Sequence, residues 1–305
     1  MSWPLVAILS YFFSATVVLI DKYLLVRPIP SPKVYSFYIG VLGTLALILI
    51  PFVNFSIPDL GQILLSLASG ALFIYSLFWY YSGLRLFEAS RIVPAIGGLN
   101  PIFIFSLTCL FGKEIFDIKE GLAFVLLIAG SIFITLQREK FITLKSLRIS
   151  AIAALLFSLA FFTAKFVYLV QPFWSGFIWM RIGGFLAGIT FFFSKEVKEE
   201  LFKKRVSFKK KTVGIFLFGQ SLGAGSVLCQ NWAIALVPLS LLAFINALEG
   251  TKYIFLLIFT ILLSLTQPFL AKKTGLKEEI SKKVILQKIV AILLIGTGLM
   301  FLALK

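Results

Sequence analysis

Ten apolar segments, each close to the length of a membrane-spanning helix, follow one another along this chain of 305 residues. A helix rises about 1.5 Å per residue, so roughly 20 apolar residues cross the hydrocarbon layer of a bilayer. The pattern therefore predicts an all-α polytopic membrane protein with about ten transmembrane helices. The expected spans cover residues 3–26, 34–54, 60–84, 91–112, 118–137, 147–170, 174–194, 212–236, 239–266 and 285–304.

The composition excludes two other classes of protein. Hydrophobic residues make up 60% of the chain and charged residues only 14%, whereas soluble domains contain about 45–50% and about 25%. A soluble globular enzyme is therefore excluded, and a disordered chain is excluded because 34 Phe residues would collapse together. The first apolar run has no basic residues before it, so we expect a first span rather than a removable signal peptide.

Basic residues are concentrated in alternate joints between the apolar segments. The odd-numbered joints and their flanks hold 23 of the 29 Lys and Arg residues. Cytoplasmic loops of membrane proteins carry such an excess, so the odd joints, including the basic loop 195–211, are expected in the cytoplasm and both termini outside. We expect a multi-pass protein of the plasma (cytoplasmic) membrane. No segment forms a folded basic face, so the net charge of +16 does not predict nucleic-acid binding.

The second half of the chain repeats motifs of the first half. The paired segments are 19–28 with 162–172, 93–105 with 242–255, and 125–136 with 291–302. The repeat predicts two domains of five helices each, residues 1–140 and 145–305. An odd number of spans per repeat inserts the second repeat upside down, as in secondary transporters whose substrate site lies between the repeats near the bilayer midplane.

Several short motifs resemble those of the EamA-type family of the drug/metabolite transporter superfamily. They are VP followed by NP in the fourth segment, GKE at Gly112 to Glu114, LLIAGSIFITL in the fifth segment, and ALEG and LLIGTGLMFLAL in the second half. The resemblance covers nearly the whole chain and implies two EamA-like repeats. It also implies a secondary transporter, of the exporter type, for a small polar or amphipathic metabolite. The second half departs from the pattern, because a longer Lys-rich loop follows Gln267 and Pro268.

Four ionisable residues lie inside spans of the second half, namely Lys165, Arg181, Glu249 and Lys252. Such a residue costs about 2.5–3.5 kcal/mol at the centre of a membrane helix, so it normally faces the protein interior. The spacing from Pro172 and Pro238 puts Lys165, Arg181 and Glu249 at similar depth, and we expect them to meet in a polar cavity. Two cations and one anion leave one positive charge in surplus, which favours a carboxylate or another anionic group as ligand.

Other polar residues are expected at the same site. Asn246, Glu249 and Tyr253 share one helix face by their spacing, and Asn100 is the repeat counterpart of Glu249. The expected substrate-binding residues are therefore Lys165, Arg181, Glu249, Asn246, Lys252, Asn100, Tyr253 and Asn231. Glu249 is the only acidic residue expected deep in a span, which makes it the candidate proton carrier. Trp79, Tyr80 and Tyr81 end the third segment and are expected at the membrane interface.

Alternative interpretations of these residues remain. Glu249 with Lys165 or Arg181 also fits a structural ion pair that holds the bundle together, and a Lys at this depth also fits snorkelling to the interface. Asn231 fits a hydrogen bond between helices equally well.

The sequence predicts no enzyme activity, cofactor or metal. The chain has no His and no GxxxxGK[ST] motif, so metal ligation and ATP hydrolysis are not expected. The expected partners are a small-molecule substrate and membrane lipid, with energy from a proton or ion gradient or from the substrate gradient. The alternatives are a membrane-embedded enzyme for a lipid-like substrate and a non-transporting membrane partner protein. No oligomeric state follows from the pattern.

The charge pattern makes the membrane orientation testable. A cysteine introduced as Lys204→Cys should resist a membrane-impermeant thiol reagent in intact cells and react after the cells are opened, because loop 195–211 is expected in the cytoplasm. Rapid labelling in intact cells would reverse the orientation.

Overall fold

The computed structural model describes residues 2–26, 31–87, 89–112, 117–135, 143–202, 210–266 and 282–303, and every regular element in these ranges is a helix. The expected all-α class is therefore confirmed. Seven helices are long and apolar enough to cross a membrane: Trp3–Leu25, Pro32–Phe52, Leu60–Leu86, Leu144–Val170, Phe173–Phe193, Thr212–Leu236 and Leu239–Phe259. Shorter apolar helices, Ala95–Phe111, Gly121–Gly130 and Ile289–Gly298, lie at the fourth, fifth and tenth expected segments.

The helices of the first 140 residues follow the expected segments closely. They are α1 (Trp3–Val26), α2 (Pro32–Gly43), the 3-10 helix η1 (Thr44–Phe52), α3 (Leu60–Leu86), α4 (Ala89–Gly112) and α5 (Ile118–Thr135). Local sequence explains where two of them begin. Asp59 accepts a hydrogen bond from the backbone N–H of Gln62 at the start of α3, and Ser31 caps α2 just before Pro32. Both are favoured arrangements for a first helical turn.

The helices of the remaining chain are more varied. They are α6 (Leu144–Val170), α7 (Phe173–Thr190), η2 (Phe191–Phe193), α8 (Lys195–Phe202), α9 (Lys210–Leu236), η3 (Leu239–Leu241), α10 (Leu242–Ala247), α11 (Gly250–Thr266) and α13 (Lys282–Ala303). Two expectations differ from this order. Part of the expected loop 195–211 is the helix α8, because Val197 is buried against an apolar cluster. The expected continuous segment 239–266 is divided at Leu248 and Glu249.

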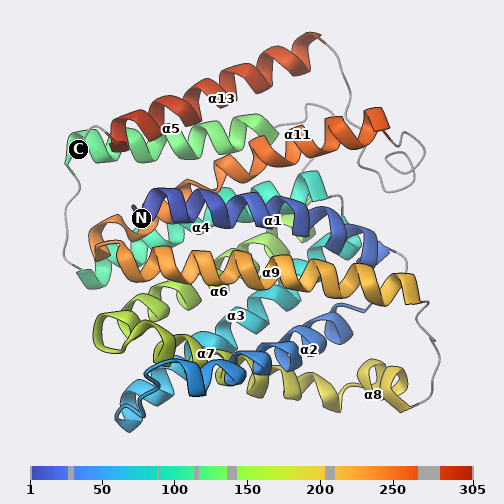
Figure 1. Ribbon diagram of the computed structural model, residues 1–305. Coiled ribbons are helices and arrows are strands. Elements are labelled where there is room, and N and C mark those ends of the chain that lie inside the picture. The colour runs from blue at the N-terminus through green and yellow to red at the C-terminus, as the bar shows by residue number, and fades with distance from the viewer. Residues whose placement is uncertain are drawn as a thin grey trace.

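The helices lie roughly side by side in an elongated bundle, with α1, α3, α4, α6 and α9 at its centre (Figure 1). Helices α5, α11 and α13 lie along one edge, and α2, α7 and α8 along the other. The start of α1 and the end of α13 lie at one end of the bundle. The other end carries α8 and the starts of α2 and α9, and is called the α8 end below.

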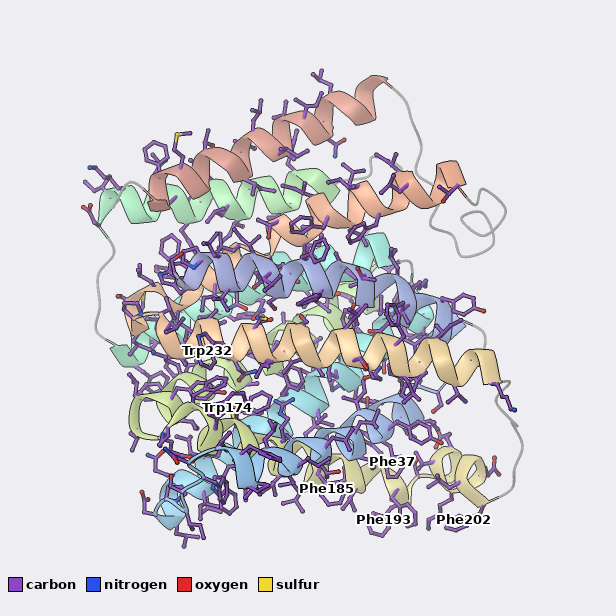
Figure 2. The ribbon with its side chains drawn as sticks, in the orientation of Figure 1. Phe37, Trp174, Phe185, Phe193, Phe202 and Trp232 are labelled. Atoms are coloured by element: carbon purple, nitrogen blue, oxygen red, sulfur yellow. The ribbon has the colours of Figure 1, made fainter. Side chains whose placement is uncertain are left out.

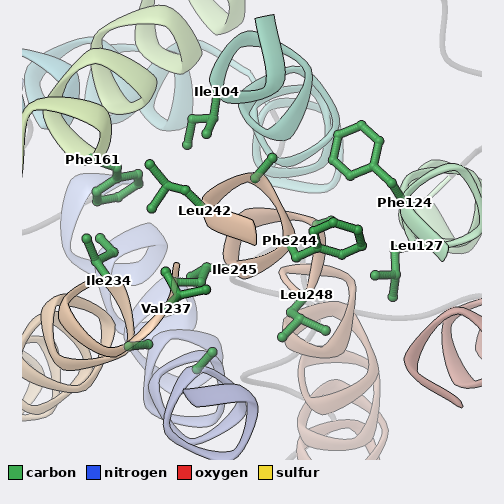
Figure 3. Close-up of a cluster of buried hydrophobic side chains, with 14 of the residues drawn as sticks. Ile104, Phe124, Leu127, Phe161, Ile234, Val237, Leu242, Phe244, Ile245 and Leu248 are labelled. Atoms are coloured by element: carbon green, nitrogen blue, oxygen red, sulfur yellow. The ribbon is translucent and has the colours of Figure 1, made fainter. Parts of the chain in front are cut away.

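The short helix α10 lies at the centre of the largest apolar cluster (Figure 3). Its Phe244 packs against Phe124 of α5 with ring centroids 5.7 Å apart. Large hydrophobic side chains also cover the outside of the bundle, and Phe193 and Phe202 near α8 are 72% and 71% exposed (Figure 2). An apolar interior together with an apolar outer surface is what a bundle surrounded by lipid requires.

Glycines bring the backbones of α3 and α7 into direct contact. A Cβ atom built on Gly70 of α3 would overlap the carbonyl oxygen of Met180, and one built on Gly183 of α7 would overlap the backbone of Leu67. Small residues allow this close approach between membrane helices, where packing replaces the hydrophobic effect.

The close contact between α3 and α7 predicts a large effect of a single methyl group. Gly70→Ala should destabilise the protein by about 1–3 kcal/mol or more, because backbone atoms cannot move aside easily. The matched control is Gly121→Ala in α5, where nothing lies within 4 Å of the added Cβ, and it should be neutral or slightly stabilising. Thermal unfolding in detergent measures both, and equal midpoints for the two variants would contradict the packing.

Candidate functional site

A cavity of about 510 Å³ lies between helices of both halves of the chain. Its walls come from α1, α2, η1, α3 and α4 of the first half and from α6, α7, α9 and the turn before α11 of the second half. Most lining side chains are aliphatic or aromatic. The charged and amide side chains among them are Asp21, Asn100, Arg181, Gln220, Gln230, Glu249 and Lys252.

Glu249 lies in the short break between α10 and α11. The backbone N–H of Glu249 donates to Asn246, three residues earlier, so the chain tightens into a turn at this point. Glu249 and Lys252 form an ion pair and are only 8% and 6% exposed. Gly97 of α4 makes room for this turn, because a Cβ there would overlap the Tyr253 hydroxyl and lie 3.1 Å from the Glu249 carboxyl carbon.

Arg181 of α7 points its guanidinium into an aromatic corner of the cavity. The guanidinium carbon lies 5.2 Å from the ring centroid of Phe73 and 5.1 Å from that of Phe177. Both distances are within the range of cation–π attraction. Its Nε atom is buried and has no hydrogen-bond partner within the described part of the chain. The ring faces therefore stabilise the charge, while the buried Nε–H group stays without a partner.

Asn100 of α4 joins the cavity wall to α10 and α6. Its amide nitrogen donates to Asn246 Oδ1 at 3.1 Å, and its own Oδ1 accepts from Ser158 at 2.7 Å. Asn246 is fully buried behind the wall rather than in the cavity lining. Tyr253 also lies outside the lining, and its hydroxyl donates to the Val93 carbonyl at 3.0 Å.

Lys165 does not join Arg181 and Glu249 in the cavity lining. Its ammonium is 3.2 Å from each of the carbonyl oxygens of Ile234 and Ala235, in the last turn of α9. Carbonyls at a helix C-terminus lack intrahelical partners and carry partial negative charge, so they bind an ammonium well. The expected meeting of three charges is thus limited to Arg181 and Glu249, and Glu249 pairs with Lys252 rather than with Lys165.

The remaining predicted residue, Asn231 of α9, also lies outside the cavity lining. It accepts a hydrogen bond from Tyr168 of α6 at 2.9 Å, and its amide nitrogen donates to the Val227 carbonyl. The contact with Tyr168 is a hydrogen bond between two helices, which was the alternative interpretation of Asn231. Trp232 and Trp174 lie beside it, with ring centroids 6.3 Å apart (Figure 2).

Sequence analysis missed Asp21 of α1. It is 2% exposed and lines the cavity, so the expectation that Glu249 is the only acidic residue deep in a span is wrong. Its carboxylate accepts a hydrogen bond from the hydroxyl of Tyr35 at 2.5 Å, and Tyr81 lies beside it. Tyr80 and Tyr81 line the cavity. The signal in the sequence was an acidic residue inside the first apolar segment.

Comparisons with known proteins identify the fold alone. No family model matches the chain, and no curated protein matches it. A solved structure described only as a crystal structure of a protein is similar to it, with a TM-score of 0.65 and 18% sequence identity. The match covers 99% of this chain and 95% of that one, so it extends over the complete helix arrangement.

The contacts of Glu249 predict the outcome of a double-mutant cycle. Lys252→Met should lower stability by up to about 3–5 kcal/mol, because it leaves a buried carboxylate without its cation. Adding Glu249→Gln should restore much of the folded yield. The matched control is Lys165→Met, which Glu249→Gln should not rescue, because Lys165 binds carbonyls of α9. Size-exclusion yield and thermal unfolding of the five variants measure these effects, and rescue of Lys165→Met would make Lys165 the partner of Glu249.

Proposed function

We propose that this protein is a secondary transporter, of the exporter type, for a small amphipathic metabolite with an anionic group, and that it is similar to EamA-type transporters. The observation that carries the proposal is the cavity of about 510 Å³ in which Arg181 keeps a donor without a partner. Small-molecule sites are typically cavities of about 300–1,000 Å³, mainly apolar with a few polar groups.

The proposal includes ten spans arranged as two inverted repeats, residues 1–140 and 145–305. Two equivalent contacts support it. Lys22 of α1 donates to the carbonyls of Leu84 and Phe87 at the end of α3, at 2.7 and 2.8 Å. Lys165 of α6 donates in the same way to the end of α9. The first span of each half thus binds the C-terminal carbonyls of the third expected span of its own half, as a repeat requires.

The charges of the second half favour an anionic ligand. The Glu249–Lys252 pair is neutral as a unit, so Arg181 is the cation of the lining that has no ion-pair partner among the described residues. The lining also holds Asp21, so an anionic group is favoured beside Arg181 and not by the net charge of the whole cavity. A guanidinium binds carboxylate or phosphate oxygens through directed N–H donors. The aromatic and aliphatic walls then accommodate an apolar body. Energy for transport would come from a proton or ion gradient or from the substrate gradient itself.

Transport into proteoliposomes tests the function and the role of Arg181 together. A panel of radiolabelled metabolites, grouped as anionic, neutral and cationic, should give saturable uptake for an anionic member. Arg181→Leu should weaken binding of that member roughly 10- to 100-fold, which corresponds to losing a charge-assisted hydrogen bond of about 1.5–3 kcal/mol. The matched control is Arg148→Leu, since Arg148 lies exposed at the start of α6.

Two results would contradict the proposal. Absence of saturable uptake for every class would remove the transport function. If Arg181→Leu and Arg148→Leu take up an anion with equal affinity, the transport function stands, but Arg181 is not part of the binding site.

A further inference from the structure

The cluster around Asp21 joins four helices beside the cavity. Asp21 of α1 accepts a hydrogen bond from Tyr35 of α2, and Tyr81 of α3 lies beside it. Gln220 of α9 donates to the Tyr35 hydroxyl at 3.4 Å. Tyr35 also packs against Tyr81, with ring centroids 4.6 Å apart. The carboxylate therefore binds α1 to α2 through Tyr35, and Tyr35 in turn contacts α3.

Asp21 differs from Glu249 in having no cation beside it within the described ranges. The neighbouring Lys22 directs its ammonium to the carbonyls of Leu84 and Phe87, and no ion pair joins Asp21 to another described residue. The titratable and charged groups that face Asp21 or share its cavity are Tyr11 from α1, Tyr35 from α2, Tyr80 and Tyr81 from α3, Arg181 from α7, Glu249 from the turn before α11 and Lys252 from α11.

Burial makes the charge of this carboxylate costly. A carboxylate removed from water and not paired with a cation loses most of its hydration energy, and phenol hydroxyls replace only part of it. A neutral carboxyl group avoids that cost but makes weaker hydrogen bonds, because bonds to an ionised acceptor are roughly twice as strong. Gain of a proton therefore lowers the strength of the contact between α1 and Tyr35.

We propose that Asp21 is a proton-binding site in the cavity wall, and that the proton bound there weakens the attachment of α1 to α2. Water in the cavity delivers the proton to a carboxylate oxygen, and no other bond forms or breaks. The site goes beyond the proposed transport function, since it requires no substrate. It is distinct from Glu249, which forms an ion pair with Lys252.

Infrared difference spectroscopy on the purified protein tests proton binding directly. Lowering the pH should produce the carbonyl band of a protonated carboxyl group, and Asp21→Asn should remove that band while Glu249→Gln keeps it. Tyr35→Phe keeps the carboxyl group of Asp21 but removes a hydrogen-bond donor that stabilises its charged form. The carboxylate should therefore take up its proton, and the band should appear, at less acidic pH. An unchanged band in Asp21→Asn would overturn the site. If Asp21→Asn does not fold, an unshifted band in Tyr35→Phe would overturn it.

Cysteine accessibility tests the effect on α1. Ser14 lies on α1 in the cavity wall, so Ser14→Cys is placed in a background with Cys109→Ala and Cys229→Ala. A small thiol reagent should label it about tenfold faster when Asp21 is protonated, as expected for loss of a hydrogen bond of about 1.5 kcal/mol. The labelling rate of a cysteine also changes with pH because only the thiolate reacts. The rate for Ser221→Cys on α9, another position in the cavity wall, gives this correction. Equal corrected rates at both pH values would overturn the effect on α1, whether or not the protein transports a substrate.

Discussion

Hydrocarbon offers no hydrogen-bond partner, so each polar group inside this bundle must find its partner within the chain. The backbone meets this requirement by forming helices throughout the described ranges. The side chains meet it by binding the ends and breaks of those helices. Lys22 and Lys165 bind carbonyls at the ends of α3 and α9, and Asn100 binds Asn246 and Ser158. Among the described residues a few buried polar atoms still lack a partner, and Arg181 Nε is the one that belongs to a residue of the cavity lining.

The helices could be predicted well because their length and apolar character are local properties. The expected segments 3–26, 60–84 and 212–236 agree closely with α1, α3 and α9. The break before α11 could not be predicted in this way, because the residues around Glu249 continue an apolar run. Similarly, α8 was expected as a loop because most of its residues are charged, and only Val197 among its described side chains is buried in the apolar cluster.

The site was only partly predictable because partners depend on how each helix is rotated about its axis. The cost of intramembrane charge correctly directed attention to Arg181, Glu249 and Lys252, which all line the cavity. Depth alone could not show that Lys165 faces the end of α9. Asp21 escaped notice because its donor, Tyr35, lies 14 residues away along the chain and meets it only in the folded bundle.

The cavity has one stiff wall and one compliant wall. Helices α3 and α7 touch through backbone atoms at Gly70 and Gly183, so they resist relative displacement and behave as one rigid body. Helices α2 and α9 meet instead through aromatic rings, with Tyr38 and Phe216 centred 6.0 Å apart. Rings can rotate and slide with little loss of contact. Relative displacement of the helices around the cavity is therefore expected to be smaller between α3 and α7 than between α2 and α9.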